Sequence, residues 1–320
     1  MSITHKGRSY QSGHIRDNMY ENIIATAFNN SGEYFISGRT MIEHILTFSD
    51  DVVDQIIVFN LGLTDEEKSI INDYPKTQVV EFPEVPYEGY TDCMTDEQTS
   101  QSRNHVWKCG AVRHAQEYGK NILWIDSGIA PFTNVGKVLE VIARDGLFFS
   151  SDQRWRNDWR TSENYWKGIN MTEEERGKFQ VFAAILGWQA GGPYQQVIED
   201  IYKVSQDAET IQNPMMEQGL NEQSLWGLTA NRAGYELQVN DVWDNDNNLG
   251  RANRGWGLGM PDQMRIYRDR DGSILMRVWR NDGFYGSRYR PMLTKIMSLG
   301  ASKATMLYER LLSFAPPEYQ

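Results

Sequence analysis

A carboxylate directly follows a short and strongly apolar segment in the middle of the chain. The segment reads Ile122-Leu123-Trp124-Ile125, and Asp126, Ser127 and Gly128 come next. Such an apolar run is typical of a strand buried on both faces of a sheet, so Asp126 would stand at the strand's end. A carboxylate there can hold a divalent cation against a diphosphate, or it can simply cap the following turn. These residues alone leave both alternatives open.

Two other short stretches carry side chains that could act on a ligand. Lys108 lies on a predicted helix that precedes the Asp126 strand, and Glu222 and Gln223 open a later predicted helix. A carboxylate or amide at a helix start can stabilise positive charge that develops during a reaction. The same residues also suit the first turn of any helix, and a lone helical lysine is usually exposed.

The elements that must position these residues alternate along the chain. The apolar patterns predict strands at 22–28, 55–60, 77–82, 121–125, 147–150 and 180–188, and helices near 42–46, 106–118, 135–142, 194–202 and 221–233. Thr64 and Glu67 form a capping box that predicts one more helix. This alternation predicts an α/β fold, a mostly parallel sheet with helices on both faces. Asp126 would then lie where open α/β sheets bind ligands.

The chain's predicted organisation has one large domain and an extension. Residues 1–260 are expected to form the catalytic domain, with a Trp-rich insertion at 152–178 that contains Trp155, Trp159 and Trp166. Residues 88–102 and 241–259 are expected to be loops. Residues 261–320 are expected to add a hairpin at 265–280, turning at Asp271 and Gly272, and an amphipathic helix after Pro291.

Composition excludes several function classes. The formal net charge is −11 with a pI near 5.0, so the chain as a whole would repel a nucleic-acid backbone. Five histidines without zinc spacing, and the absence of P-loop, G-x-G-x-x-G and G-x-S-x-G motifs, argue against zinc enzymes, NTPases, classical dehydrogenases and hydrolases. Two cysteines and no long apolar run predict a protein without a disulfide framework or membrane span, located in the cytoplasm, or in the host cytoplasm if it is phage-encoded.

The order of these motifs resembles the GT-A glycosyltransferases, in particular the branch of glycogenin-like and bacterial lipopolysaccharide transferases. The resemblance covers roughly residues 20 to 235 and rests on the Ile-Val-Phe-Asn strand, Trp107-Lys108 and Leu-Trp-Ile-Asp-Ser-Gly. It implies a Rossmann-like sheet and a nucleotide-sugar donor such as a UDP-sugar. In that family an Asp-x-Asp motif holds manganese against the diphosphate. Asp126 matches the first aspartate, so the resemblance implies Mn²⁺ or Mg²⁺ at Asp126, but Gly128 replaces the second.

The resemblance also implies roles for individual positions. The residues expected to bind the nucleotide-sugar are Thr26, Phe28, Asn30, Tyr34, Lys108, Asp126, Ser127, Gly128, Trp188 and Gln189, and those expected to be catalytic are Glu222 and Gln223. The first four would surround the nucleobase and ribose, Lys108 would lie near the diphosphate, and Trp188 and Gln189 would lie beneath the donor sugar. For Phe28 and Asn30 the plain alternatives are a core residue and a turn residue.

The acceptor stays open at this stage. The aromatic residues of the insertion suit both a sugar ring and a stacked base. A saccharide or glycan is the preferred acceptor of the expected hexosyl- or pentosyltransferase. The arginines make the insertion locally basic, so a modified hydroxymethyl base in DNA, as in phage DNA modification, is the alternative acceptor. The missing second aspartate favours a third alternative, a nucleotide-sugar-binding module without catalysis. The residues leave the oligomeric state open.

Overall fold

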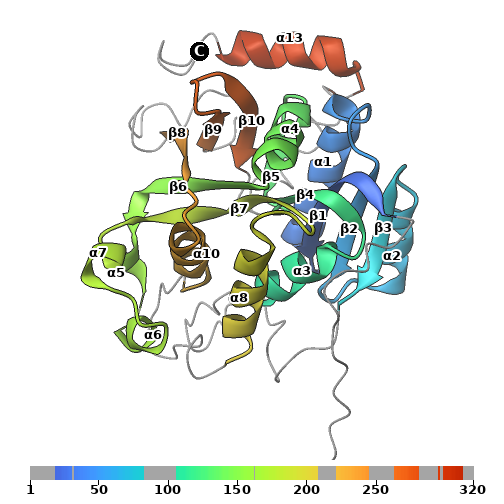
Figure 1. Cartoon of the computed structure of the whole chain (residues 1–320). Coiled ribbons are helices and arrows are strands. Elements are labelled where there is room, and N and C mark those ends of the chain that lie inside the picture. The colour runs from blue at the N-terminus through green and yellow to red at the C-terminus, as the bar shows by residue number, and fades with distance from the viewer. Residues whose placement is uncertain are drawn as a thin grey trace, which may run out of the picture.

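The chain folds around one mixed β-sheet. The computed structural model describes residues 19–30, 32–82, 106–161, 163–207, 221–244, 263–280, 295 and 298–312. Ten strands form the sheet in the order β3-β2-β1-β4-β7-β6-β8-β9-β10-β5 (Figure 1). Helices cover both faces of its central part, which confirms the predicted α/β class.

The first four strands are parallel, and their order contains a topological switch point. They are β1 (Tyr20–Phe28), β2 (Gln55–Asn60), β3 (Thr77–Glu81) and β4 (Gly119–Ile125). The chain builds β2 and β3 on one side of β1 and then returns to add β4 on the other side. The carboxyl ends of β1 and β4 therefore meet at a topological switch point, the usual ligand position in such sheets.

A single reversed strand interrupts the parallel order. β7 (Phe179–Gln189) runs antiparallel to β4 and to β6 (Leu147–Arg156), and β8 (Gln238–Asp244) is parallel to β6. From β3 to β8 only β7 is reversed, so the predicted mostly parallel sheet is confirmed. Because Ile185 is opposite Ile125, residues 179–184 of β7 extend beyond the end of β4.

The side chains of successive strand residues enter two separate cores, as the period of two requires. Trp124 packs with residues of α3 (Trp107–Ala115), α8 (Gln195–Ser205) and α10 (Asn221–Arg232). Its neighbour Leu123 packs on the opposite face with residues of α1 (Gly32–Phe48) and α4 (Gly136–Asp145), and α2 (Asp65–Asn72) adds Ile71 there. The capping box of Thr64 and Glu67 starts α2 as predicted.

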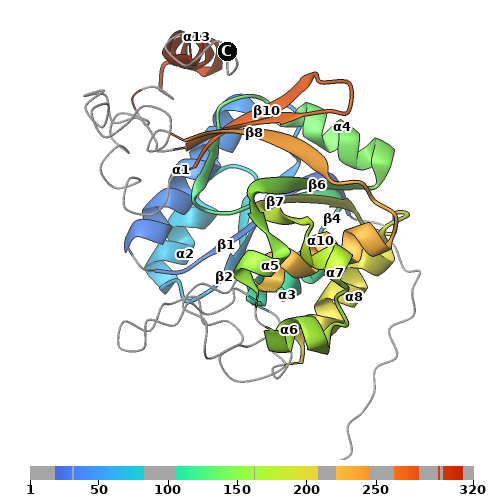
Figure 2. The same cartoon turned by 90° about the vertical axis from the view of Figure 1, so that its left-hand side faces the viewer.

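The C-terminal hairpin is part of the same sheet. Its strands, β9 (Gln263–Arg268) and β10 (Ile274–Arg280), pair with β8 on one side and with β5 (Ile129–Pro131) on the other. Tyr267, Met276 and Val278 enter the core on the α1 and α4 side, and Figure 2 shows β8 and β10 above β6 and β7. The division at residue 260 stays a prediction. The last helix, α13 (Ala301–Leu312), begins about ten residues after Pro291, and residues 291–294 lie outside the description.

Two predicted element boundaries need correction. The expected loop at 241–259 begins as strand, because 241–244 complete β8 and pair with β9; residues 245–259 lie outside the described ranges, as do 88–102. The expected insertion at 152–178 begins later, because 152–156 continue β6. The insertion proper contains α5 (Asn157–Arg160), α6 (Glu163–Gly168) and α7 (Glu173–Arg176). In both places pairing with a distant strand outweighs a polar local composition.

Candidate functional site

An ion pair between Lys108 and Asp126 lies at the carboxyl end of β4. The Lys108 ammonium is 2.9 Å from both carboxylate oxygens of Asp126, and it also donates to the carbonyl oxygen of Ala183 at 3.2 Å. The lysine side chain is 5% exposed and that of Asp126 is 32% exposed. The ammonium is thus enclosed behind a carboxylate that faces outward.

Local structure explains why these two side chains meet. Asp126 directly follows β4, and its side chain lies on the same face of the sheet as that of Trp124, the face covered by α3. Lys108 lies in the first turn of α3. The backbone N–H of Asp126 donates to Ala184 at 2.9 Å, and Ile129 N–H donates back to the Asp126 carbonyl at 2.9 Å, which closes the turn that contains Ser127 and Gly128. Both strand pairing and turn therefore fix the position of Asp126.

Trp124 also holds this carboxylate. Its indole N–H donates to Oδ1 of Asp126 at 2.6 Å, and its ring lies 6.0 Å from that of Trp107, which precedes Lys108. This hydrogen bond was not predicted, although a spacing of two residues on a strand puts Trp124 and Asp126 on one face. The exposed side of Asp126 remains able to accept hydrogen bonds from hydroxyl or amine groups of a ligand.

The described residues around Asp126 do not fit the divalent cation that the GT-A resemblance implies. A cation of that kind takes several oxygen ligands, but Lys108 and Trp124 already donate to the Asp126 carboxylate and Gly128 supplies none. Among the described residues, no cluster of three or more His, Cys, Asp or Glu side chains is arranged to hold a metal ion.

Glu222 lies in the first turn of α10 and close to the same region. Its side chain is 1% exposed, and one of its oxygens accepts the backbone N–H of Gln223 at 2.8 Å. Burial, and then the charge of Glu222, raise the pKa of the Cys109 thiol, and Cys109 directly follows Lys108. Burial raises the pKa of Tyr165 well above its ordinary value, with Cys109 and Glu222 as further causes. Helices α3, α6 and α10 therefore converge here, with Gln223 half-buried.

The end of β1 provides only part of the expected nucleobase site. Thr26 is fully buried and Phe28 is 2% exposed, with its ring packed so closely on α1 that a Cβ at Gly38 would lie 2.5 Å from it. Phe28 is therefore a core residue, as its plain alternative predicted, and neither side chain can contact a base. Asn30 is exposed directly after β1, and Tyr34, 43% exposed, follows in the first turn of α1.

Trp188 and Gln189 lie at the opposite edge of the sheet. Gln189 pairs with Asn121 near the start of β4 and donates to its side chain at 3.2 Å. From Asn121 to Asp126 the strand extends about 16 Å, at ~3.3 Å per residue. Because β7 is antiparallel to β4, its last residues move away from Asp126, and Trp188 is buried in the core at 1% exposure. The expected position of these two residues beneath a donor sugar at Asp126 needs correction.

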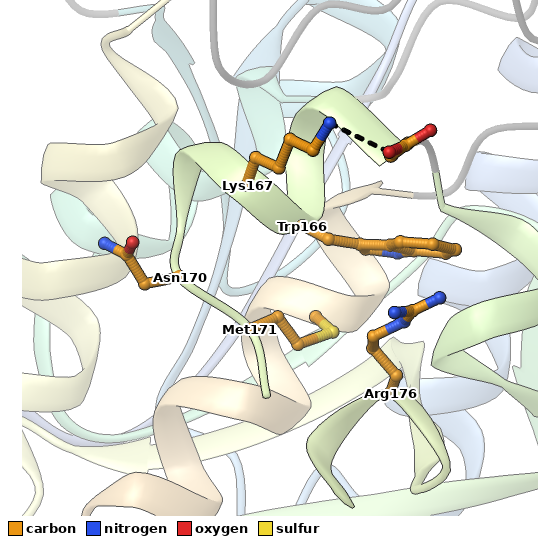
Figure 3. A pocket seen from close by; sticks show the side chains of 6 residues that line it. Trp166, Lys167, Asn170, Met171 and Arg176 are labelled. Atoms are coloured by element: carbon orange, nitrogen blue, oxygen red, sulfur yellow. Dashed lines mark ion pairs between the residues drawn. The ribbon is translucent and has the colours of Figure 1, made fainter. Parts of the chain in front are cut away.

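A pocket opens in the insertion (Figure 3). It has a volume of about 770 Å³ and is lined by Glu163, Trp166, Lys167, Asn170, Met171 and Arg176. The Arg176 guanidinium lies 3.8 Å from the centre of the Trp166 ring, and Lys167 pairs with Glu163 at 2.8 Å. Trp166 follows the buried Tyr165 on α6, so the pocket belongs to the helix that also packs toward Glu222 and Cys109.

Arg232 at the end of α10 ties the insertion to the rest of the molecule. Its guanidinium makes two hydrogen bonds to Glu175 of α7, at 2.8 and 2.9 Å, and donates to the carbonyls of Ile169 and Asn170. The pair with Arg232 lowers the pKa of Glu175 to about 2. The pocket is therefore built on a segment anchored to α10.

Comparison with known proteins found distant structural likenesses only. No family model matches the chain, and no curated protein matches it. Galactosyltransferase LgtC, solved with donor and acceptor sugar analogs, is 15% identical over 65% of this chain and 70% of its own, with a TM-score of 0.43. The mannosyltransferase Ktr4p from S. cerevisiae is 11% identical over 70% of this chain and 71% of its own (TM-score 0.38), and mouse xyloside xylosyltransferase 1 is 8% identical over 71% and 85% (TM-score 0.39). Likenesses of this degree do not establish an activity. No described helix has the length and apolarity needed to cross a membrane.

Proposed function

We propose that this protein is a glycosyltransferase that moves a sugar from a nucleotide-diphosphate sugar to a hydroxyl group of an acceptor. The observation that supports this most is the Lys108–Asp126 pair, with its carboxylate facing outward at the switch point of the sheet. A fixed carboxylate suits the hydroxyl groups of a ribose or a sugar. Glu222 of α10 lies near Cys109, which directly follows Lys108.

The proposed reaction breaks the bond between the anomeric carbon and the diphosphate oxygen. The acceptor hydroxyl oxygen forms the new bond to that carbon, its proton is released, and the nucleoside diphosphate leaves with the bonding electron pair. The departing diphosphate would take the proton. Asn30 and Tyr34, the exposed residues at the end of β1, would bind the nucleobase.

A saccharide or glycan is the acceptor that the insertion pocket favours. Trp166 lines the pocket with an aromatic ring, one face of which Arg176 covers, and Asn170, Lys167 and Glu163 offer hydrogen-bond partners for hydroxyl groups. Sugars are commonly bound by this combination, in which the apolar face of the ring stacks on an aromatic side chain. The hexosyl or pentosyl identity of the transferred group belongs to the same proposal.

The test is a panel of nucleoside diphosphates and nucleotide sugars, read by calorimetry and by release of free sugar through slow transfer to water. One nucleotide series should bind selectively, and its sugar conjugate should be hydrolysed. Asp126→Asn keeps the size of the side chain and should lower hydrolysis at least tenfold. Asp145→Asn removes a carboxylate of α4 that pairs with Arg144, and should leave turnover unchanged. If no member of the panel binds, the proposal fails.

A non-catalytic nucleotide-sugar-binding module is the second candidate. The observation that favours it is the glycine at position 128 together with the burial of Glu222. Selective binding without release of sugar, in the presence of oligosaccharide acceptors as well, would identify this alternative.

A further inference from the structure

We infer that this site binds its nucleotide donor without a divalent cation, because the Lys108 ammonium supplies the positive charge that balances Asp126. The inference rests on the proposed function. It makes Lys108 a positioning residue and Asp126 a direct hydrogen-bond acceptor for hydroxyl groups of the donor.

Protein donors already occupy most acceptor positions of the Asp126 carboxylate. Oδ1 accepts from the Trp124 indole and lies 2.9 Å from the Lys108 ammonium, which is equally close to Oδ2. Two carboxylate oxygens offer about four acceptor positions, and these donors take most of them. What remains suits a hydrogen bond from a ligand better than chelation of a cation.

The second argument is that Lys108 cannot move away. Its ammonium is enclosed at 5% exposure and is also held by the carbonyl of Ala183 at 3.2 Å. A divalent cation on the free side of the Asp126 carboxylate would lie within about 6 Å of this fixed charge, where the repulsion between like charges is strong. The lysine therefore opposes the cation at the position where it would bind.

The third argument is the balance of charge. Asp126 and Lys108 together have a net charge of zero, and Gly128 supplies no second carboxylate. A divalent cation at Asp126 would therefore add positive charge that position 128 does not balance. A single aspartate without either cation would repel the diphosphate.

The first experiment uses the unmodified protein and compares the affinity for each nucleoside diphosphate in EDTA and in Mn²⁺. The inference expects the best-bound nucleotide to have dissociation constants that agree within about threefold (under ~0.7 kcal/mol, at 1.4 kcal/mol per tenfold). Binding at least tenfold tighter in Mn²⁺ overturns the inference and leaves the proposed function standing. Absence of binding under both conditions overturns the proposed function, and the inference with it.

The second experiment substitutes the lysine and measures the same affinities. Lys108→Met keeps the length of the side chain and removes its charge, so binding in EDTA should fall at least tenfold, and Mn²⁺ should restore part of it. The control Lys120→Met removes a half-exposed charge that pairs with Glu21 at the opposite edge of the sheet and should bind as the wild type does. Undiminished binding by Lys108→Met in EDTA would overturn the role of the lysine.

The third experiment restores the missing carboxylate. Gly128 does not have the positive φ that disfavours other residues, so Lys108→Met/Gly128→Asp offers two aspartates without a competing ammonium. This variant should bind the nucleotide at least tenfold more tightly in Mn²⁺ than in EDTA. If it behaves like the wild type in both, Lys108 does not decide metal dependence. If Lys108→Met fails to fold, the wild-type comparison alone decides.

Discussion

At the scale of residues, the site depends on the buried ammonium of Lys108, which pairs with the carboxylate of Asp126. Lys108 has Asp126 as its carboxylate partner and the Ala183 carbonyl as a further acceptor. Burying an ammonium is costly unless it is paired. The identity of residue 126 therefore affects stability as well as binding.

Asp126→Ala should lower the free energy of unfolding by about 2 to 3 kcal/mol, somewhat less than the ~3–5 kcal/mol for a fully buried pair. The expected loss is smaller than for a fully buried pair because the Asp126 side chain is 32% exposed. Asp126→Asn should cost less, because its amide oxygen can still accept from Lys108. Urea unfolding of both variants measures the difference, and an equal cost for both would show that the amide oxygen of Asn does not replace the carboxylate as an acceptor for Lys108.

Sequence reasoning located the residues of this pair but not their surroundings. Asp126 follows from an apolar strand that ends in a carboxylate, and Lys108 from its place on the preceding helix. The close contact between them depends on how α3 packs on the sheet, which no local pattern contains. Phe28 shows the same limit, because an aromatic residue at a strand end is equally suited to a base and to the core.

At the scale of elements, close packing between β7 and its neighbours restricts substitution. A Cβ added at Gly187 would lie 2.5 Å from Ile142 Cδ1 and 2.9 Å from Phe148 Cβ. Gly187→Ala should therefore destabilise by about 1 to 3 kcal/mol through overpacking. The matched control is Gly227→Ala in α10, where an added Cβ would lie 3.4 Å from its nearest neighbour, Cγ2 of Val181.

Gly227→Ala should instead stabilise by about 0.5 to 1 kcal/mol, because alanine is the better helix former. Thermal unfolding of the two variants and the wild type shows whether each substitution raises or lowers the stability. A stabilising Gly187→Ala would mean that α4 moves away from β7 at little cost.

The connection between α10 and the insertion should depend on pH. The pKa of Glu175 is lowered from 4.5 to about 2, chiefly by Arg232, so their pairing stabilises the folded state at pH values above about 4.5. This stabilisation is lost as the pH falls toward 2. Arg232→Met should cost about 1 kcal/mol at pH 7, since Arg232 is 43% exposed and solvent screens the pair.

Unfolding in urea at several pH values checks this prediction. The difference between wild type and Arg232→Met should shrink below pH 4.5, because protonation of Glu175 removes the pair in the wild type as well. A difference that is constant with pH would mean that Arg232 acts only through the Ile169 and Asn170 carbonyls.

Sequence patterns predicted most elements, because apolar runs and helical periodicity are local. They could not predict that β7 is reversed, since a run buried on both faces has no direction in its composition. The reversal is also what separates Gln189 from Asp126. The loop prediction for 241–259 was wrong in its first residues for a related reason. Residues 241–244 are stabilised as part of β8 by pairing with β9, which is distant in the sequence.

At the scale of the whole molecule, net charge favours a saccharide over DNA as the proposed acceptor. The chain carries a formal charge of −11, and long-range repulsion would oppose approach to a DNA backbone. In and around the insertion, Arg156 of β6 donates to the Gly177 carbonyl, Arg176 stacks on Trp166, and Arg232 of α10 pairs with Glu175. These described guanidinium groups are held by the protein itself and do not form a row of phosphate-binding charges.

Binding to duplex DNA should therefore be weaker than the ~10⁻⁴ to 10⁻⁶ M typical of non-specific binding at physiological salt. Fluorescence anisotropy with labelled duplexes, one unmodified and one containing hydroxymethylated bases, measures this affinity over a range of salt concentrations. Micromolar binding that weakens steeply with salt would contradict the prediction, because it requires several phosphate contacts. It would also make a modified base the preferred acceptor, and the insertion pocket would then have to admit a flipped base in place of a saccharide.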